Sequence, residues 1–213
     1  SGELQEKLNK YKPKNLHEAS LLEGITPAAL NVLTIHLKKS MHLELTKTQE
    51  KNLKALAQQI IDRNTQHNLT GYKNIEKLYK EQIVDCVKAL HACKTRLSKT
   101  VVDCGSGAGL PGLVWGVMDN SLNIVTIDNN LKKINFQKKA IKTLQLNNIT
   151  PIHTRTEDHS EQKKHTIVTK AFSSVKKTIE ANKNNKSKKN LMLIKKDNEK
   201  THQELLDAAP LIY

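Results

Sequence analysis

The chain has 213 residues, of which 37% are hydrophobic and 26% are charged, fractions that are typical of a globular protein with its own core. Its formal net charge of +14 favours a polyanionic partner such as a nucleic acid. Nearly all of the positive charge is lysine, however, and a bias towards A/T-rich codons gives the same enrichment without selection for binding. Both explanations stay open at this stage.

Several classes of protein are disfavoured by what the sequence lacks. No apolar run approaches the ~18 residues that a membrane span needs, and the first residues contain no apolar signal segment. Three cysteines cannot all pair within one chain, and the spacing of Cys86 and Cys93 is not that of a zinc site. We therefore expect a cytoplasmic protein that binds neither a membrane nor a metal ion. We also expect a monomer.

The chain up to about residue 95 has the pattern of helices. Thr46 and Gln49 have the spacing of a capping box, and leucine and isoleucine recur at helical spacing directly after them. A polar break at residues 64–74 precedes a second apolar pattern, which predicts a further helix over residues 75–90. We interpret residues 1–72 as a helical N-terminal region and residues 73–213 as a second domain.

From residue 100 onwards, short apolar runs alternate with amphipathic stretches. The runs are TVVDC, NIVTID, TPIHT, HTIVTKA and NLMLIKK, and one of the stretches between them is LKKINFQKKAIKTLQL. Strands that alternate with helices predict an α/β fold with a mainly parallel sheet and right-handed crossovers.

Five of the eight glycines lie within the twelve residues 105–116, directly after the first predicted strand. Glycine permits a tight turn and a close approach of a ligand to the backbone, and the following helix offers unpaired N–H groups. Gly107, Gly109 and Gly112 match the pattern G-x-G-x-x-G, and Asp128 ends the next predicted strand, where an acidic residue that binds a ribose belongs. The sequence thus predicts a nucleotide site that includes Gly107 and Asp128.

The residues before the loop narrow the choice of nucleotide. Asp103 extends the loop to D-x-G-x-G-x-G, a form typical of enzymes that use S-adenosylmethionine (SAM). A site for NAD in an oxidoreductase and a tight turn with no ligand are the two alternatives. Lys195 follows the last predicted strand, and it is a candidate substrate contact because open α/β sheets bind ligands outside the carboxyl ends of their strands.

Five segments together resemble the RsmG (GidB) family over roughly residues 60–208. They are VVDCGSGAGLPGL, IVTIDNNLKKINF, LQLNNITPIHTRTED, IVTKAFSS and LMLIKK, in that order. The resemblance implies a Rossmann-like class I SAM-dependent methyltransferase that methylates N7 of a guanine in bacterial small-subunit (16S) ribosomal RNA. Its partner would be that rRNA or a ribosomal particle. The resemblance implies two further strands after the fifth in a complete sheet of this kind, and we expect the sequence up to Tyr213 to lack them.

The resemblance also implies which residues contact SAM. They are Gly105 and Leu110 in the loop, Thr156 and Glu157 after the third strand, and Lys170 after the fourth. No residue is implied to act as a catalytic acid or base, so we expect catalysis by positioning.

Four positions depart from the family pattern. Lys170 stands where the family usually has arginine, which keeps the charge but loses the planar two-pronged donor. Gln82 and Cys86 stand in place of the usual histidine and serine, and Lys196 replaces a glycine. A non-catalytic RNA-binding protein with a degenerate nucleotide pocket is therefore the main alternative function.

Overall fold

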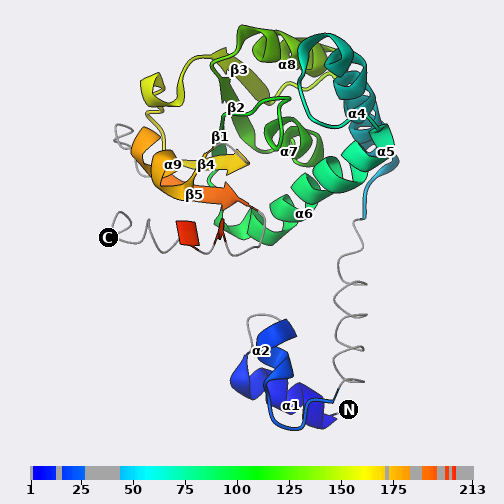
Figure 1. The fold of residues 1–213 in the computed structure, drawn as a ribbon, viewed down its shortest axis with the longest axis vertical. Helices are drawn as coiled ribbons and strands as arrows, with labels where there is room; N and C mark the ends of the chain where they lie inside the picture. Colours follow the sequence, from blue (N-terminus) through cyan, green and yellow to red (C-terminus); the bar gives the residue numbers. More distant parts are fainter. Residues whose placement is uncertain are drawn as a thin grey trace. The chain divides into compact units, whose positions relative to one another are not determined.

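A computed structural model describes residues 2–12, 16–26, 44–170, 173–182, 189–195, 200–201 and 203–204. The chain divides into two compact units, Ser1–Glu44 and Leu45–Tyr213 (Figure 1). The first unit contains helices α1 (Gly2–Tyr11) and α2 (Leu16–Ser20). Within it, the Lys7 ammonium donates a hydrogen bond to the carbonyl oxygen of Glu23 at 3.0 Å.

The second unit is built on one five-stranded sheet with the strand order β3-β2-β1-β4-β5. The strands are β1 (Thr100–Cys104), β2 (Asn123–Asp128), β3 (Ile149–His153), β4 (His165–Lys170) and β5 (Lys189–Ile194). Every pair of neighbouring strands is parallel, which confirms the predicted α/β, Rossmann-like fold. The chain order reverses between β1 and β4, and this switch point is where such sheets bind ligands.

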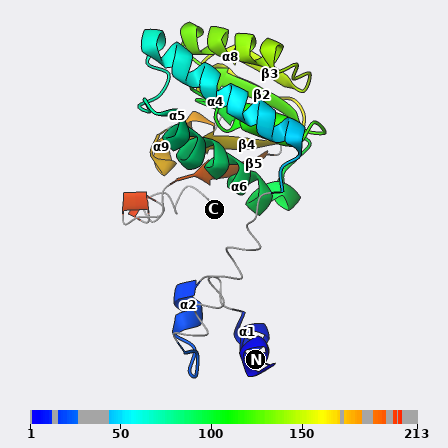
Figure 2. The ribbon, with the colours of Figure 1, turned by 90° about the vertical axis from the view of Figure 1, so that its right-hand side faces the viewer.

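The helices of this unit cover both faces of the sheet. Their bounds are α4 (Lys47–His67), α5 (Ile75–Leu78), α6 (Val84–Cys93), α7 (Gly112–Met118), α8 (Leu131–Thr143) and α9 (Val175–Ala181). Helices α7 and α8 pack on β2 and β3, and α4 lies against both of these helices. Figure 1 and Figure 2 show α9 on the side of the sheet away from α4, α6 and α7.

Local structure explains where α4 begins and how the next helical run is interrupted. Thr46 and Gln49 form the predicted capping box at the start of α4, with both reciprocal hydrogen bonds present. The helix predicted over residues 75–90 is a run of α5, a π-helical turn (Tyr79–Ile83) and α6. A π-turn inserts one extra residue into the helix and therefore shifts the face that the following residues present.

The core lies between the sheet and the helices on either side of it. Val102, Cys104, Ile127 and Ile167 form a buried cluster within β1, β2 and β4. Trp115 of α7 is fully buried, and its indole N–H donates to the carbonyl oxygen of Cys86 in α6 at 2.8 Å. This bond ties the helical part before the sheet to the first helix after the glycine loop.

The structure groups α4 with the sheet, although the sequence places that helix in the N-terminal region of residues 1–72. Compact grouping is not a test of independent folding, so the boundary between residues 72 and 73 stays a prediction. Among the described residues, no helix is both long enough and apolar enough to cross a membrane.

Candidate functional site

The glycine loop follows β1 and leads into α7, as the sequence predicts. Gly105, Gly107 and Gly109 have φ angles of 68°, 58° and 83°, a left-handed conformation that favours glycine. The amides of Gly109 and Leu110 both donate to the carbonyl oxygen of Ser106, at 2.8 and 2.9 Å. These bonds close a tight turn at the carboxyl end of β1.

Two of the five glycines serve the packing of α7 on the sheet rather than a ligand. A Cβ atom on Gly112 would come within 2.6 Å of Thr126 Cγ2, and one on Gly116 would collide with the Ile149 side chain. Gly107 differs from them, because a Cβ there would have only the Gly105 carbonyl oxygen nearby, at 4.0 Å. Open space at Gly107 is what a loop needs if a ligand is to approach its backbone.

Asp128 joins the end of β2 to the glycine loop. One carboxylate oxygen accepts the Gly107 amide at 2.9 Å, and the other accepts the Asn130 amide at the same distance. The Lys133 ammonium lies 3.9 Å from the first of these oxygens. Each oxygen retains a further lone pair, so this buried carboxylate can still accept a hydrogen bond from a ligand.

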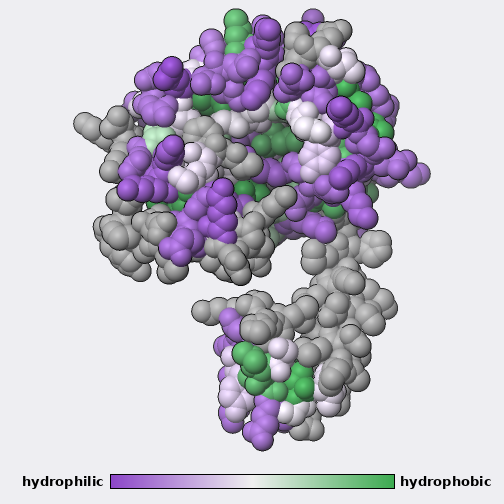
Figure 3. Space-filling model, in the orientation of Figure 1, coloured by the Kyte–Doolittle hydropathy of each residue, from purple (hydrophilic) through white to green (hydrophobic). Residues whose placement is uncertain are grey.

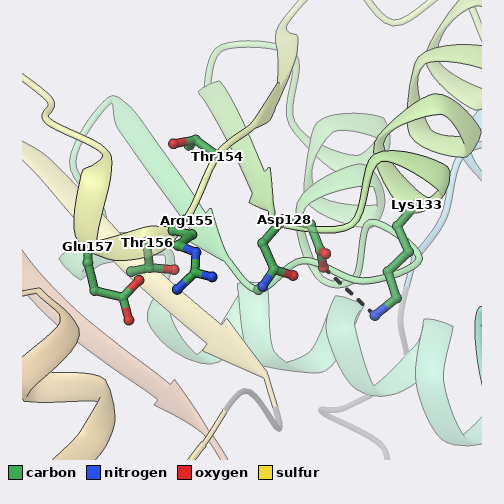
Figure 4. A pocket seen from close by; sticks show the side chains of 8 residues that line it. Asp128, Lys133, Thr154, Arg155, Thr156 and Glu157 are labelled. Atoms are coloured by element: carbon green, nitrogen blue, oxygen red, sulfur yellow. Dashed lines mark ion pairs between the residues drawn. The ribbon is translucent and has the colours of Figure 1, made fainter.

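A cavity of about 310 Å³ lies beside these residues. Its lining is Gly105, Asp128, Asn129, Lys133, Thr154, Arg155, Thr156 and Glu157. Figure 4 shows Asp128 and Lys133 on one side of it and the segment from Thr154 to Glu157 on the other. The cavity therefore opens at the carboxyl ends of β1, β2 and β3, with two acidic and two basic side chains around it.

The structure brings four predicted site residues together in this cavity, namely Gly105, Asp128, Thr156 and Glu157. Gly107 reaches it through its bond to Asp128, whereas Leu110 lies half-buried in the loop and is not part of the lining. Prediction from the sequence missed four lining residues: Asn129, Lys133, Thr154 and Arg155. Their signal is position, since each follows the end of a strand by no more than five residues.

Lys170 lies at the end of β4, outside the lining of the cavity, and its side chain is only 10% exposed. Its ammonium donates to the Gln82 side-chain oxygen at 2.8 Å, lies 3.4 Å from Cys86 Sγ, and pairs with Asp85 at 3.9 Å. Lys170, which departs from the family pattern, thus contacts two other positions that depart from it, Gln82 and Cys86. Burial raises the pKa of the Cys86 thiol to about 12, with Lys170 opposing the shift, so this thiol stays neutral.

Lys195 follows β5, and its ammonium is already engaged. It donates to the Glu204 carboxylate and to the carbonyl oxygen of Ser173, both at 2.6 Å. The hydrogen bond from Lys195 lowers the pKa of Glu204 below its ordinary value. A contact of Lys195 with substrate stays a prediction. Lys196 lies outside the described residues.

Asp103 is a fully buried carboxylic acid within β1. One of its oxygens accepts the Gly112 amide at 2.8 Å, and the other has no hydrogen-bond partner. Burial raises the pKa of Asp103 to about 7, the Gly112 amide opposes the shift, and the nearby Asp128 charge adds to it. The carboxyl group of Asp103, the first residue of the D-x-G-x-G-x-G pattern, is therefore partly protonated near neutral pH.

Substituting Asp103 with asparagine is expected to remove a pH dependence of stability. Because the pKa of Asp103 is raised from 3.8 to about 7, the folded state keeps a proton that the unfolded state loses between these values. The free energy of unfolding of the wild type should therefore fall between about pH 4 and 7 relative to Asp103→Asn, by roughly a few kcal/mol. Urea unfolding from pH 4.5 to 8.5 measures this difference.

The matched control for that measurement is Asp62→Asn, at an exposed position of α4. The difference in the free energy of unfolding between Asp62→Asn and the wild type should not show the change between pH 4 and 7 that is expected for Asp103→Asn. A constant difference between wild type and Asp103→Asn across the series would contradict the raised pKa.

Comparisons with known proteins agree with this geometry. Residues 49–212 match the model of the GidB family, rRNA small subunit methyltransferase G. Residues 1–62 match a second model, the C-terminal helical bundle of the tRNA modifying enzyme MnmG/GidA. The putative caffeoyl-CoA O-methyltransferase from Staphylococcus aureus has a similar fold, with a TM-score of 0.51 and 10% identity over 85% of this chain and 88% of that one.

Individual relatives share the name of the first family. Ribosomal RNA small subunit methyltransferase G from Chromohalobacter salexigens is 32% identical over 156 residues, which are 73% of each protein. The protein of the same name from Clostridium perfringens strain SM101 is 37% identical over 100 residues, 47% of this chain. The matched part is 42% of the length of that relative. Because the first family model matches more than half of the chain, the chain belongs to the GidB family.

Proposed function

We propose that the second unit binds SAM and transfers its methyl group to N7 of a guanine in 16S rRNA. The observation that carries the proposal is the cavity at the carboxyl ends of β1, β2 and β3, which Asp128 joins to the open face of the glycine loop. Membership of the GidB family supports the choice of reaction.

The residues around the cavity fit SAM. The open space at Gly107 admits a nucleotide to the backbone, and the spare lone pairs of Asp128 suit the hydroxyl groups of a ribose. SAM carries an ammonium and a carboxylate on its amino-acid portion, and the lining offers Glu157 for the first charge and Arg155 or Lys133 for the second. When bound, SAM supplies a methyl group activated by a sulfonium centre.

The chain's own contribution is alignment rather than proton transfer. Guanine N7 has an in-plane lone pair and no proton in the neutral base, so its methylation needs no general base. Rigid positioning of the two reactants can then account for much of the acceleration. The tight turn at Ser106 and the bonds of Asp128 hold the loop side of the site in one arrangement.

Surface charge supports RNA as the partner. Helix α8 contains five lysines and no acidic residue, and four of these lysines, Lys132, Lys138, Lys139 and Lys142, are exposed. Figure 3 shows hydrophilic side chains over most of the described surface of the second unit on the face in view. Lysines of this kind bind phosphates and release counterions. We place the protein in the cytoplasm as a monomer that acts on 16S rRNA or a ribosomal particle.

The first unit adds a second proposal on domain organisation. Its compactness supports a module distinct from the methyltransferase, with a boundary near residue 45. The match to the helical bundle of a tRNA modifying enzyme covers this unit and extends to residue 62. The boundary near residue 45 lies before α4, whereas the sequence favours residue 72. We propose that the module contacts tRNA.

Crosslinking with tritiated SAM tests the main proposal. The label should be displaced by S-adenosylhomocysteine and not by NAD, and the methyl group should pass to small-subunit rRNA that lacks the modification. Displacement by NAD would instead support an oxidoreductase. Binding of rRNA without any labelling by SAM would support a degenerate pocket. Binding of bulk tRNA to the same protein tests the second proposal, that the first unit contacts tRNA.

A further inference from the structure

Gln137 is a fully buried amide in the middle of α8. Its NH₂ group donates to the Ser106 hydroxyl and to the Gly107 carbonyl oxygen, both at 2.9 Å. Its oxygen accepts the hydroxyl of Thr126 in β2 at 2.6 Å. The side chain thus connects β2, α8 and the glycine loop, and every hydrogen-bonding group of the amide except one lone pair is used.

The position of Gln137 in its helix points to a role other than packing. It shares the buried face of α8 with Ile134, Phe136 and Ala140, where an apolar residue would serve the core. A buried amide destabilises the fold unless all of its polar groups are paired. Gln137 forms its hydrogen bonds with the glycine loop and with β2. Its polar groups therefore hold the loop in one conformation.

Gly107 is held by side chains from two directions. Its amide donates to Asp128 at the end of β2, and its carbonyl oxygen accepts from Gln137 in α8. The residue between these two bonds has the left-handed φ of 58° and faces open space. The two bonds fix the peptide groups on both sides of the residue whose backbone a nucleotide would approach.

We propose that Gln137 is the positioning residue that holds the glycine loop in the shape that binds SAM. This inference rests on the proposed function for the identity of the ligand. A loop ordered before binding loses less conformational entropy when the ligand arrives, so affinity rises without any added contact. Gln137 therefore acts on SAM through Ser106 and Gly107.

Two substitutions of Gln137 test the proposal in the full chain. Gln137→Leu keeps the side-chain size and removes all three hydrogen bonds. Gln137→Glu places a second oxygen against the Gly107 carbonyl oxygen. Each should raise the Kd for S-adenosylhomocysteine, measured by calorimetry, at least tenfold. The KM for SAM should rise in parallel, and kcat at saturating SAM should change less than threefold.

Hydrogen exchange of the ligand-free protein provides a readout that does not depend on SAM. In both variants the amides of Gly107, Gly109 and Leu110 should exchange at least tenfold faster than in the wild type. The matched control is Thr178→Val in α9, another buried polar side chain, which bonds to the carbonyl oxygen of Ser174 instead of the loop. This control should lower the thermal midpoint and leave both the loop amides and the Kd unchanged.

The outcomes separate the two proposals. Wild-type Kd values and wild-type loop exchange in folded Gln137 variants would overturn the positioning role. A wild-type chain that binds no S-adenosylhomocysteine would overturn the proposed function, while loop exchange would still decide whether Gln137 holds the loop. If Gln137→Leu does not fold, Thr126→Val removes only the bond that orients the amide, and it should raise the Kd about threefold. An unchanged Kd in that variant would count against the proposal.

Discussion

Substituting Gly107 with valine is expected to raise the Kd for SAM at least about tenfold, which corresponds to ~1.4 kcal/mol. A Cβ atom at this position would meet no neighbouring protein atom closer than the Gly105 carbonyl oxygen at 4.0 Å. The valine side chain would therefore occupy the open space that a nucleotide needs in order to approach the loop. Calorimetry with SAM measures the effect on binding, and the thermal midpoint reports on folding.

A second effect of the valine must be separated from the first. The φ of 58° at this position costs a β-branched residue about 1–2 kcal/mol of strain, which lowers stability. Gly107→Asn reduces the strain, because asparagine tolerates the left-handed region, and still places a side chain in the open space. It should lose affinity while it keeps more of its stability.

Gly71→Val is the matched control for the Gly107 variants. This glycine also has open space around its Cβ position, but it does not have a positive φ and lies in the connection between α4 and α5. Binding of SAM by this variant should equal that of the wild type. Unchanged affinity in a folded Gly107→Val protein would exclude the glycine loop as the cofactor site.

The parts of the fold that follow from local pattern could be predicted from the sequence. Three of the five strands lie within the short apolar runs, and β3 and β5 each begin one residue before theirs. Strands of a parallel sheet read as near-continuous apolar segments, because helices cover both faces of the sheet. Asp128 could be placed beside the glycine loop, because the carboxyl ends of neighbouring parallel strands meet at one edge of a sheet. The first inference needs only local pattern, and the second needs only the pairing of two strands that follow one another in the chain.

The parts that depend on side chains meeting across the fold could not be predicted. Lys170 contacts Gln82, 88 residues earlier, and Gln82 lies in the π-turn before α6, which the helical pattern did not predict. Gln137 reaches Ser106 across 31 residues, and no periodicity indicates which polar group a buried amide will find. The glycine pattern also did not show which glycine serves which purpose. Gly112 allows α7 to pack closely on the sheet, whereas Gly107 faces open space.

Substituting the target guanine with 7-deazaguanine is expected to stop methyl transfer completely. This analogue has carbon in place of N7, so the in-plane lone pair that would attack the methyl group is absent, while the groups that pair with other bases are unchanged. The measurement is the transfer of tritiated methyl from SAM to rRNA that carries the analogue at the single target position. The same analogue at a neighbouring guanine is the matched control and should be methylated at the normal rate.

The pH dependence of the same reaction tests the mechanism that underlies this expectation. If alignment rather than a general base drives transfer, single-turnover rates at saturating SAM should be nearly constant between about pH 6 and 9. Asp103, whose pKa is raised to about 7 by burial, titrates within this range in the wild type, and its titration can give the rate a slope that no catalytic base causes. The profile is therefore measured in Asp103→Asn as well as in the wild type. A pH dependence of the rate that persists in Asp103→Asn would indicate a catalytic base elsewhere. Methylation of the 7-deazaguanine RNA would show that another atom accepts the methyl group.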